Sequence, residues 1–237
     1  MRIAEIFASL QGEGLLAGTP STFVRTSGCN LRCIWCDTPY TSWEPEGEDL
    51  SLAEVLDRVR ALPPRHAVVT GGEPLLFAEA LELCRTLRQV GWHVTVETAG
   101  TVLPAGTATG PVADLMSISP KLASSAPPPD TPGNWGPRHE SARRRDDVLQ
   151  ALMAQGPYQL KFVIDSPADL AESLAWLDDL GIDAGQIDPG RVCLMPQGRT
   201  AAELAATTAW LEPECRRLGF HLAPRHHVAW FGHTRGT

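Results

Sequence analysis

Lysine is almost missing from this chain. The 20 basic residues among its 237 comprise 18 arginines and two lysines, Lys121 and Lys161. A lysine ammonium is compact and rotatable, whereas an arginine guanidinium is a planar fork, so the two are not interchangeable. Both lysines lie in or next to a stretch that has the pattern of a core strand. This placement indicates that each of the two ammonium groups has a specific role in the protein.

The sequence also lacks long apolar runs and an excess of positive charge. It contains no 18 consecutive apolar residues, so we expect no membrane-spanning helix. Its first residues do not place a basic region before a long apolar run, so we expect no signal peptide and a cytoplasmic location. The net charge of -8 argues against nucleic-acid binding. The one basic run, Arg143–Arg145, is followed by two aspartates and is interpreted as a solvated helix face.

Cysteine is scarce outside one short segment. Three of the six cysteines fall within Cys29–Cys36, and Cys84, Cys193 and Cys215 are scattered. The tight group in a chain expected to be cytoplasmic favours metal binding over disulfides. The scattered three have apolar or helical surroundings and are interpreted as ordinary buried thiols.

Strand-like and helical patterns alternate along the chain, at intervals of roughly 25 to 30 residues. The predicted strands are 3–7, 22–26, 67–70, 93–97, 114–117, 159–164, 192–195 and 220–222. Capping boxes begin helices at Ser51 and Thr200, and Ser166 is a similar start. We expect one α/β domain over residues 1–237, with about six βα units in a partial, open TIM-like barrel. In such folds, ligands collect at the carboxyl ends of the strands.

One segment interrupts this alternation. Residues 122–137 contain five prolines, which remove backbone donors and restrict the backbone. The pattern predicts an extended or mobile loop there.

The strongest motif is the spacing C-x-x-x-C-x-x-C of Cys29, Cys33 and Cys36. Three thiolates on a short loop can hold three corners of a [4Fe–4S] cluster and leave the fourth iron open to a small molecule. A fourth cysteine nearby would give a closed electron carrier or a structural zinc site, and the sequence has none there. The alternative is a zinc site completed by His226 or His227.

With this spacing, the chain resembles the radical S-adenosylmethionine (SAM) superfamily. Further motifs narrow the resemblance to the 7-carboxy-7-deazaguanine synthase family. These are Leu10-Gln11-Gly12-Glu13-Gly14, Arg25, Cys36-Asp37-Thr38, Thr70-Gly71-Gly72-Glu73-Pro74, Glu97-Thr98-Ala99-Gly100, Ser119-Pro120-Lys121 and the tail from His226 to Gly232. The resemblance implies ring contraction of 6-carboxy-5,6,7,8-tetrahydropterin to 7-carboxy-7-deazaguanine, with loss of ammonia, in the queuosine type of 7-deazapurine pathway. It also implies that SAM binds the open iron, yields a 5′-deoxyadenosyl radical and is regenerated, and that Mg²⁺ is required.

The resemblance also assigns cofactor contacts. Thr38 is implied as a Mg²⁺ ligand, although a threonine there is equally a turn residue. The residues implied to contact SAM are Trp35, Asp37, Gly72, Glu73, Ser119, Pro120, Lys121 and Gln197. Asp37 can also support Thr38, and Trp35 can shield the cluster or contact adenine. Gly71 and Gly72 can equally form a tight turn after a strand.

The residues implied to contact the substrate come from other segments of the chain. The residues implied to contact the pterin are Leu10, Gln11, Gly12, Glu13, Arg25, Thr70 and Glu97. A guanidinium at Arg25 can hold a carboxylate bidentately, or it can form a salt bridge at the rim. Glu97 can pair with the amidine edge of the pterin or with the ribose of SAM. Lys161 can face the barrel interior or pair with a neighbouring acid, and His226 and His227 are interpreted as packing of the tail.

Two other functions compete with this one. A glycyl-radical activase shares the cysteine spacing, but docking to a partner protein explains neither the Leu10–Gly14 motif nor the Ser119–Lys121 motif. A zinc or iron–sulfur module without catalysis would not cleave SAM. The family resemblance further implies a flavodoxin or ferredoxin as electron donor and a homodimer, with no nucleic acid or membrane as partner.

Overall fold

The computed structural model describes residues 1–105, 110–232 and 234–236. Its strands form one nine-stranded sheet in the order β3-β1-β2-β4-β5-β6-β7-β8-β9. The strands are β1 (Arg2–Leu10), β2 (Pro20–Thr26), β3 (Glu48–Asp49), β4 (His66–Gly71), β5 (His93–Thr98), β6 (Leu115–Ile118), β7 (Tyr158–Ile164), β8 (Val192–Pro196) and β9 (His221–Leu222).

From β2 to β9 each strand runs parallel to its neighbour, and the spatial order follows the chain order. That order is typical of a barrel wall rather than of a doubly wound sheet. Because β3 and β9 are the two edges, the barrel is open, as the sequence predicts.

The start of the sheet differs from the expected βα units. β1 pairs with β2 antiparallel, and β3 pairs with β1 antiparallel. The connection between β1 and β2 is too short for a crossover helix, so the two strands form a hairpin. The loop that carries the cysteines therefore follows β2, the first strand of the parallel part.

The helices are α1 (Leu52–Arg60), α2 (Ala78–Gln89), α3 (Trp135–Arg143), α4 (Asp146–Met153), α5 (Pro167–Asp179), α6 (Ala201–Leu218) and α7 (His226–Phe231). Short 3-10 turns are η1 (Pro39–Thr41), η2 (Pro74–Leu76), η4 (Ala123–Ser125) and η5 (Pro189–Arg191). The predicted capping boxes at Ser51, Ser166 and Thr200 are present. In the described part of the chain, no helix combines the length and the apolar character needed to cross a bilayer.

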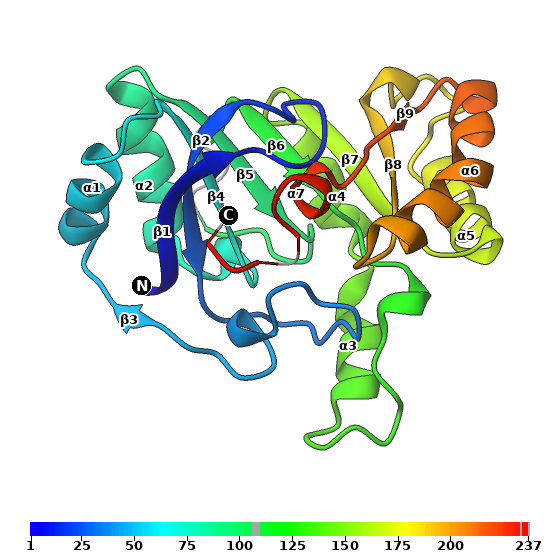
Figure 1. Cartoon of the computed structure of the whole chain (residues 1–237), viewed down its shortest axis with the longest axis horizontal. Coiled ribbons are helices and arrows are strands. Elements are labelled where there is room, and N and C mark those ends of the chain that lie inside the picture. The colour runs from blue at the N-terminus through cyan, green and yellow to red at the C-terminus, as the bar shows by residue number, and fades with distance from the viewer. Residues whose placement is uncertain (106–109, 233, 237) are drawn as a thin grey trace.

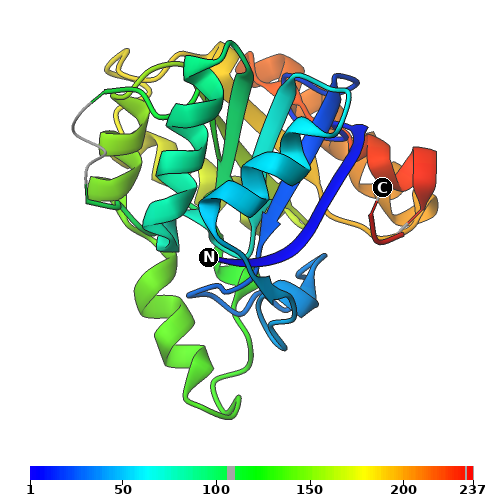
Figure 2. The same ribbon diagram turned by 90° about the vertical axis from the view of Figure 1, so that its left-hand side faces the viewer.

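The main core lies between the sheet and the helices that cover its outer face (Figures 1 and 2). The parallel strands in the middle of the sheet are buried almost throughout, as in β4 and β6. Cys84, Cys193 and Cys215 are buried free thiols, which confirms their interpretation. The inner face carries a smaller apolar group and leaves room for a cavity.

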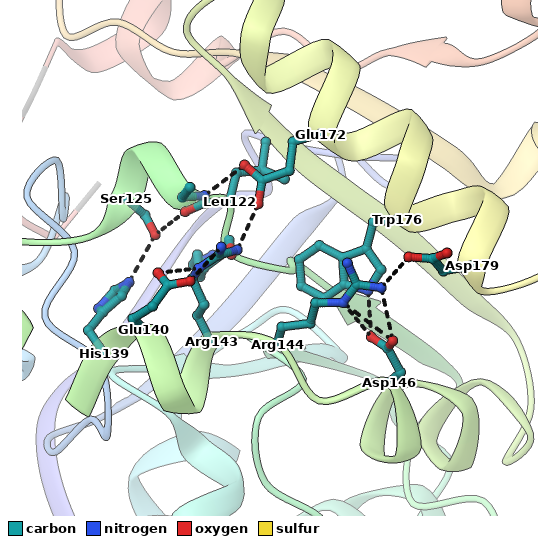
Figure 3. A network of polar contacts seen from close by, with 12 residues as sticks. Leu122, Ser125, His139, Glu140, Arg143, Arg144, Asp146, Glu172, Trp176 and Asp179 are labelled. Atoms are coloured by element: carbon teal, nitrogen blue, oxygen red, sulfur yellow. Dashed lines mark hydrogen bonds and ion pairs between the residues drawn. The ribbon is translucent and has the colours of Figure 1, made fainter. Parts of the chain in front are cut away.

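Between β6 and β7, one sequence expectation holds in part and another is wrong. The proline-rich segment has no helix or strand over 126–134, but it contains η4 and the first turn of α3, because proline is tolerated in the first turn of a helix. The arginine run is not one helix face: Arg143 ends α3, Arg144 follows it, and Arg145 precedes α4. In Figure 3, Arg143 and Arg144 pair with acidic side chains, including Glu172 and Asp179 of α5.

Candidate active site

A cavity of about 540 Å³ opens at the carboxyl ends of the parallel strands. It is formed by the β1–β2 turn, the cysteine loop, the ends of β4 to β8 and the C-terminal tail. The predicted residues that line it are Leu10, Gln11, Gly12, Glu13, Arg25, Cys29, Cys33, Trp35, Cys36, Asp37, Thr38, Thr70, Gly72, Glu97, Ser119 and Lys121. Segments far apart in the sequence thus meet at one cavity of the size that small ligands require.

The three clustered cysteines share one wall of this cavity as free thiols. Burial raises the pKa of the Cys29 and Cys33 thiols to about 12. A metal cation can still displace the proton of such a thiol, which is released to solvent while the thiolate binds the metal. No other cysteine of the described residues lines the cavity. The donor set therefore fits a cluster held by three thiolates.

The backbone of the cysteine loop is fixed from several sides. Gly28 N donates to Thr41 O at 2.8 Å, and Glu73 N donates to Gly28 O at 2.9 Å. The Trp43 indole donates to Cys33 O at 3.0 Å, and Ile34 N donates to Ser125 O at 3.0 Å. The loop therefore keeps its shape through contacts to the turn after β4, to η1 and the residues that follow it, and to η4.

Gly72 allows the turn after β4 to pack on the cysteine loop. A Cβ atom there would lie 2.2 Å from Gly28 O and 2.8 Å from Thr41 O, which is a clash with backbone. Gly71, just before it, has φ +137°, which favours glycine. The observed role of this pair is therefore close packing and turn geometry.

Glu73 lies behind the cavity wall, with its side chain fully buried. Its carboxylate accepts from Thr98 Oγ1 at 2.8 and 2.9 Å, from Ala99 N at 2.8 Å and from Leu75 N at 3.1 Å. Burial raises its pKa, although these hydrogen bonds act in the opposite direction. In this structure Glu73 joins the ends of β4 and β5.

On the substrate side of the predicted set, Glu97 is held from two directions. Gln11 Nε2 donates to one of its carboxylate oxygens at 3.1 Å, and Thr70 Oγ1 donates to the other at 2.8 Å. All three residues line the cavity. The result is an oriented carboxylate that projects from the end of β5.

A buried group of charges lies beside Glu97. Lys161 Nζ on β7 donates to Glu13, and the Arg225 and His227 side chains approach Glu13 at 3.6 Å. Burial alone would raise the pKa of Glu13, but the charges of Lys161, His227 and Arg225 lower it well below its usual range. Burial acts to lower the pKa of Lys161, but Glu13 and Glu97 raise it overall. Both groups of the ion pair are charged.

The tail contributes more than packing, which corrects the interpretation of His227. His226 N donates to Gly12 O at 2.9 Å, and a Cβ atom on Gly12 would lie 2.6 Å from His227 Cβ. Arg225 Nη2 lies 2.6 Å from Asp37 of the cysteine loop. His226 does pack, since it stacks on Trp230 at 5.0 Å. The sequence offered only the paired histidines as a signal for this contact.

Arg25 both lines the cavity and forms a salt bridge. Its Nε donates to Glu5 Oε2 at 2.9 Å, and Tyr40 donates to the same oxygen at 3.0 Å. Arg235 of the tail contacts Glu5 at 2.7 Å. Arg25 therefore forms a salt bridge and also lines the cavity, and its contact to a substrate carboxylate stays a prediction.

Lys121 and Trp35 close the side of the cavity near β6. Lys121 Nζ donates to Ser119 O at 2.9 Å and to Ser119 Oγ at 2.8 Å, and it lies 5.9 Å from the centre of the Trp35 ring. The indole N–H of Trp35 is buried and has no partner among the described residues. An unpaired buried donor favours a ligand that supplies the acceptor, so this corner fits a polar ligand such as SAM.

Three other predicted residues stand apart or make local contacts. Pro120 does not line the cavity, and Gln197 lines a neighbouring hollow that shares Trp35 with it. Thr38 lines the cavity, with its hydroxyl 3.0 Å from that of Thr41 and 4.0 Å from Cys36 Sγ.

Comparison with known proteins places this geometry in context. A family model described as the Radical SAM superfamily matches residues 23–113. The chain is 42% identical over 236 residues to the 7-carboxy-7-deazaguanine synthase of Rhodopirellula baltica, covering 99% of this chain and 88% of that protein. It is 44% identical over 233 residues to the enzyme of the same name from Halobacterium salinarum, covering 96% and 89%.

The fold also resembles solved structures whose sequences are less similar to this chain. The crystal structure of QueE from Escherichia coli matches with a TM-score of 0.69 at 23% identity, over 95% of this chain and 94% of that one. Streptococcus suis SuiB bound to S-adenosylmethionine matches with a TM-score of 0.56 at 12% identity, over 86% of this chain and 50% of that one. The open parallel sheet is the radical SAM fold.

Proposed function

The chain belongs to the 7-carboxy-7-deazaguanine synthase family of radical SAM enzymes, and we propose that its cavity contracts the ring of 6-carboxy-5,6,7,8-tetrahydropterin to give 7-carboxy-7-deazaguanine and ammonia. The observation that carries the proposal is the meeting of three free cysteines and an oriented carboxylate, Glu97, in one cavity. The product would enter a 7-deazapurine pathway such as that of queuosine.

Cys29, Cys33 and Cys36 would hold three irons of a [4Fe–4S] cluster and leave the fourth without a side chain. When bound, the reduced cluster and SAM supply the radical that abstracts hydrogen from the pterin carbon bearing the carboxylate. The three thiols are free and lie on one wall of the cavity, which supports this donor set.

At the SAM end, we assign Lys121 and Ser119 to the carboxylate of SAM and Trp35 to its adenine. The assignment of Lys121 is supported because its ammonium donates hydrogen bonds to Ser119, and no carboxylate of the described residues lies within 4 Å of that ammonium. The unpaired indole N–H of Trp35 supports the adenine contact. We keep Gln197, in the adjoining hollow, as a contact to the adenosine part.

At the substrate end, Glu97 would accept both N–H groups of the pterin amidine edge. Gln11 and Thr70 fix its two oxygens, which supports a paired, bidentate contact over a contact to the SAM ribose. Arg25 would bind the substrate carboxylate with the nitrogens that Glu5 leaves available. Lys161 would act by holding Glu13 in the β1–β2 turn, and so shape this end of the cavity.

Mg²⁺, the electron donor and the oligomer belong to the proposal as well. Thr38 would supply one oxygen ligand to Mg²⁺, because its hydroxyl faces the cavity beside Cys36 and a hard cation prefers oxygen donors. A flavodoxin or ferredoxin would deliver the electron, and two copies of the chain would form a homodimer.

The test is anaerobic incubation of the reconstituted enzyme with the carboxy-pterin, SAM, Mg²⁺ and dithionite. We expect 7-carboxy-7-deazaguanine by mass spectrometry, in amounts that exceed the SAM consumed. A protein that cleaves SAM but leaves the pterin unchanged would refute the assigned substrate. A protein that binds zinc and does not cleave SAM would refute the enzyme class.

A further inference from the structure

The turn after the cysteine loop places a buried hydroxyl against one of the three clustered thiols. Ser42 Oγ donates to Cys36 Sγ at 3.4 Å, and the serine is 2% exposed. Ser42 lines the cavity together with the cysteines, although no sequence motif marked it as a site residue. In the described part of the chain its hydroxyl has no other hydrogen-bond partner. A buried hydroxyl needs a partner, and here the sulfur supplies it.

A second hydroxyl near the same sulfur is committed elsewhere. Thr38 Oγ1 lies 4.0 Å from Cys36 Sγ but only 3.0 Å from Thr41 Oγ1. Thr41 Oγ1 donates its own hydrogen to Thr38 O at 2.9 Å. Because a hydroxyl carries a single hydrogen, Thr41 Oγ1 accepts in the contact between the two threonine hydroxyls, and Thr38 donates there. Ser42 is therefore the hydroxyl that donates to Cys36.

The backbone on both sides of Ser42 is fixed. Thr41 O, directly before it, accepts from Gly28 N at 2.8 Å. Trp43, directly after it, donates its indole N–H to Cys33 O at 3.0 Å. Both contacts reach the cysteine loop itself. The serine between them is therefore held beside the sulfur by bonds in which the sulfur takes no part.

A donor at this sulfur acts unequally on the two oxidation states of a cluster. Cys36 would bind one iron as a thiolate, and a hydroxyl aimed at a thiolate forms a charge-assisted hydrogen bond. The reduced cluster carries one more negative charge than the oxidised cluster, so this bond stabilises the reduced state more. Hydrogen bonds to the ligating sulfurs are among the factors that set the reduction potential of an iron–sulfur cluster.

We propose that Ser42 is a positioning residue that raises the reduction potential of the cluster through its hydrogen bond to Cys36 Sγ. This inference rests on the proposed function, because it requires the cluster that the three cysteines would hold. In the step concerned, the oxidised cluster gains one electron and the reductant loses it. At a higher potential, a given reductant keeps a larger fraction of the enzyme in the reduced state that cleaves SAM.

The test measures the potential itself, on reconstituted protein without the pterin. Anaerobic samples are poised at a series of potentials, and the reduced cluster is quantified by EPR. For Ser42→Ala we expect the equilibrium constant for one-electron reduction to fall about threefold to tenfold, because a hydrogen bond to a charged group is lost. At about 59 mV for a tenfold change, the potential falls by roughly 30 to 60 mV. Where most of the cluster is oxidised, the rate of SAM cleavage should fall by the same factor.

Ser27→Ala is the matched control. Ser27 is 3% exposed, stands two positions before Cys29, and has a buried hydroxyl with no hydrogen-bond partner among the described residues. The variant removes a buried hydroxyl from the start of the same loop without removing a bond to sulfur. It should leave the reduction potential unchanged.

A second pair of variants separates the hydroxyl from the shape of the side chain. Ser42→Thr keeps the hydroxyl, and Ser42→Val gives a β-branched side chain of the same shape without it. Any strain from the added methyl group is common to both. The reduction equilibrium of Ser42→Thr should exceed that of Ser42→Val by the same factor of about three to ten. This pair decides the matter if Ser42→Ala binds less iron than the wild type.

Equal potentials in Ser42→Ala and the wild type would overturn the proposal. Equal potentials in Ser42→Thr and Ser42→Val, or an equal fall in Ser27→Ala, would also overturn it. A failure of the proposed function would look different, because a wild-type chain that binds zinc and shows no reducible [4Fe–4S] signal would remove the cluster itself. A protein whose potential responds to Ser42 but that leaves the pterin unchanged would keep this inference and refute only the assigned substrate.

Discussion

The buried pair of Glu13 and Lys161 offers a test of how the β1–β2 turn is held over the cavity. The Lys161 side chain is 6% exposed and that of Glu13 is 16% exposed. Removing one member of a buried pair typically costs about 3 to 5 kcal/mol, because the other charge stays buried without compensation. For Lys161→Met we expect about 3 kcal/mol, since Arg225 and His227 remain 3.6 Å from Glu13.

Glu13→Gln should be worse, at about 4 kcal/mol. Lys161 would then face only Glu97, whose carboxylate oxygens are already bonded to Gln11 and Thr70. The double variant Glu13→Gln/Lys161→Met leaves neither charge and should recover about 2 kcal/mol or more relative to the sum of the single losses.

Thermal and urea unfolding of the anaerobic, reconstituted protein measure these losses. In a chain of this size, 3 kcal/mol corresponds to roughly 6 to 12 °C in Tm. Lys121→Met is the matched control, because within the described part of the chain Lys121 donates to Ser119 and forms no ion pair. A loss below about 1 kcal/mol for Lys161→Met, or additive losses in the double variant, would refute the reasoning.

Four further predictions concern single side chains. Cys33→Ala should retain the fold and abolish SAM cleavage, and retained cleavage would remove it from the cluster ligands. Arg25→Ala should raise the KM for the carboxy-pterin at least about tenfold, as expected for loss of a charged hydrogen bond. The rate of SAM cleavage without substrate should stay within about twofold of that of the wild type. Equal losses in both assays would contradict the assignment. Thr38→Ala should shift the Mg²⁺ concentration for half-maximal activity, and an unchanged metal dependence would exclude it as a ligand. Burial lowers the pKa of His66 from 6.5 to about 4. Neutral His66 therefore stabilises the fold above pH 6.5, and this contribution is lost as the pH falls towards 4. His66→Gln should flatten the dependence of the free energy of unfolding on pH between 6.5 and 4, and an unaltered slope would contradict the shift.

Local patterns were sufficient for much of the fold and for the cysteine loop. Each predicted strand is present, because runs such as Val68-Val69-Thr70 are β-branched and are followed by glycine. The cysteine spacing could be recognised without tertiary information, whereas the shape of the loop depends on contacts to Thr41, Glu73 and Ser125. The antiparallel pairing of β1 with β2 could not be predicted, because alternating hydrophobicity identifies a strand but not whether it runs parallel or antiparallel to its neighbour.

The parts that sequence reasoning missed depend on contacts between distant segments. Lys161 and Glu13 are 148 positions apart, and Arg225 and His227 join them only because α7 crosses the β1–β2 turn. Composition likewise indicated a loop up to residue 137, whereas α3 begins at Trp135 and is held by contacts of His139 and Arg143 to other segments. The packing role of Gly72 depends on Gly28 O, which no local motif reveals.

The central claim is that this cavity brings the carboxylate-bearing carbon of the pterin to the reactive end of SAM. Carboxy-pterin carrying deuterium at that carbon tests it most directly, with SAM recovered after turnover under anaerobic conditions. We predict deuterium in the recovered SAM and none in SAM incubated with Cys33→Ala. Product formation with no label in SAM or in 5′-deoxyadenosine would contradict the account.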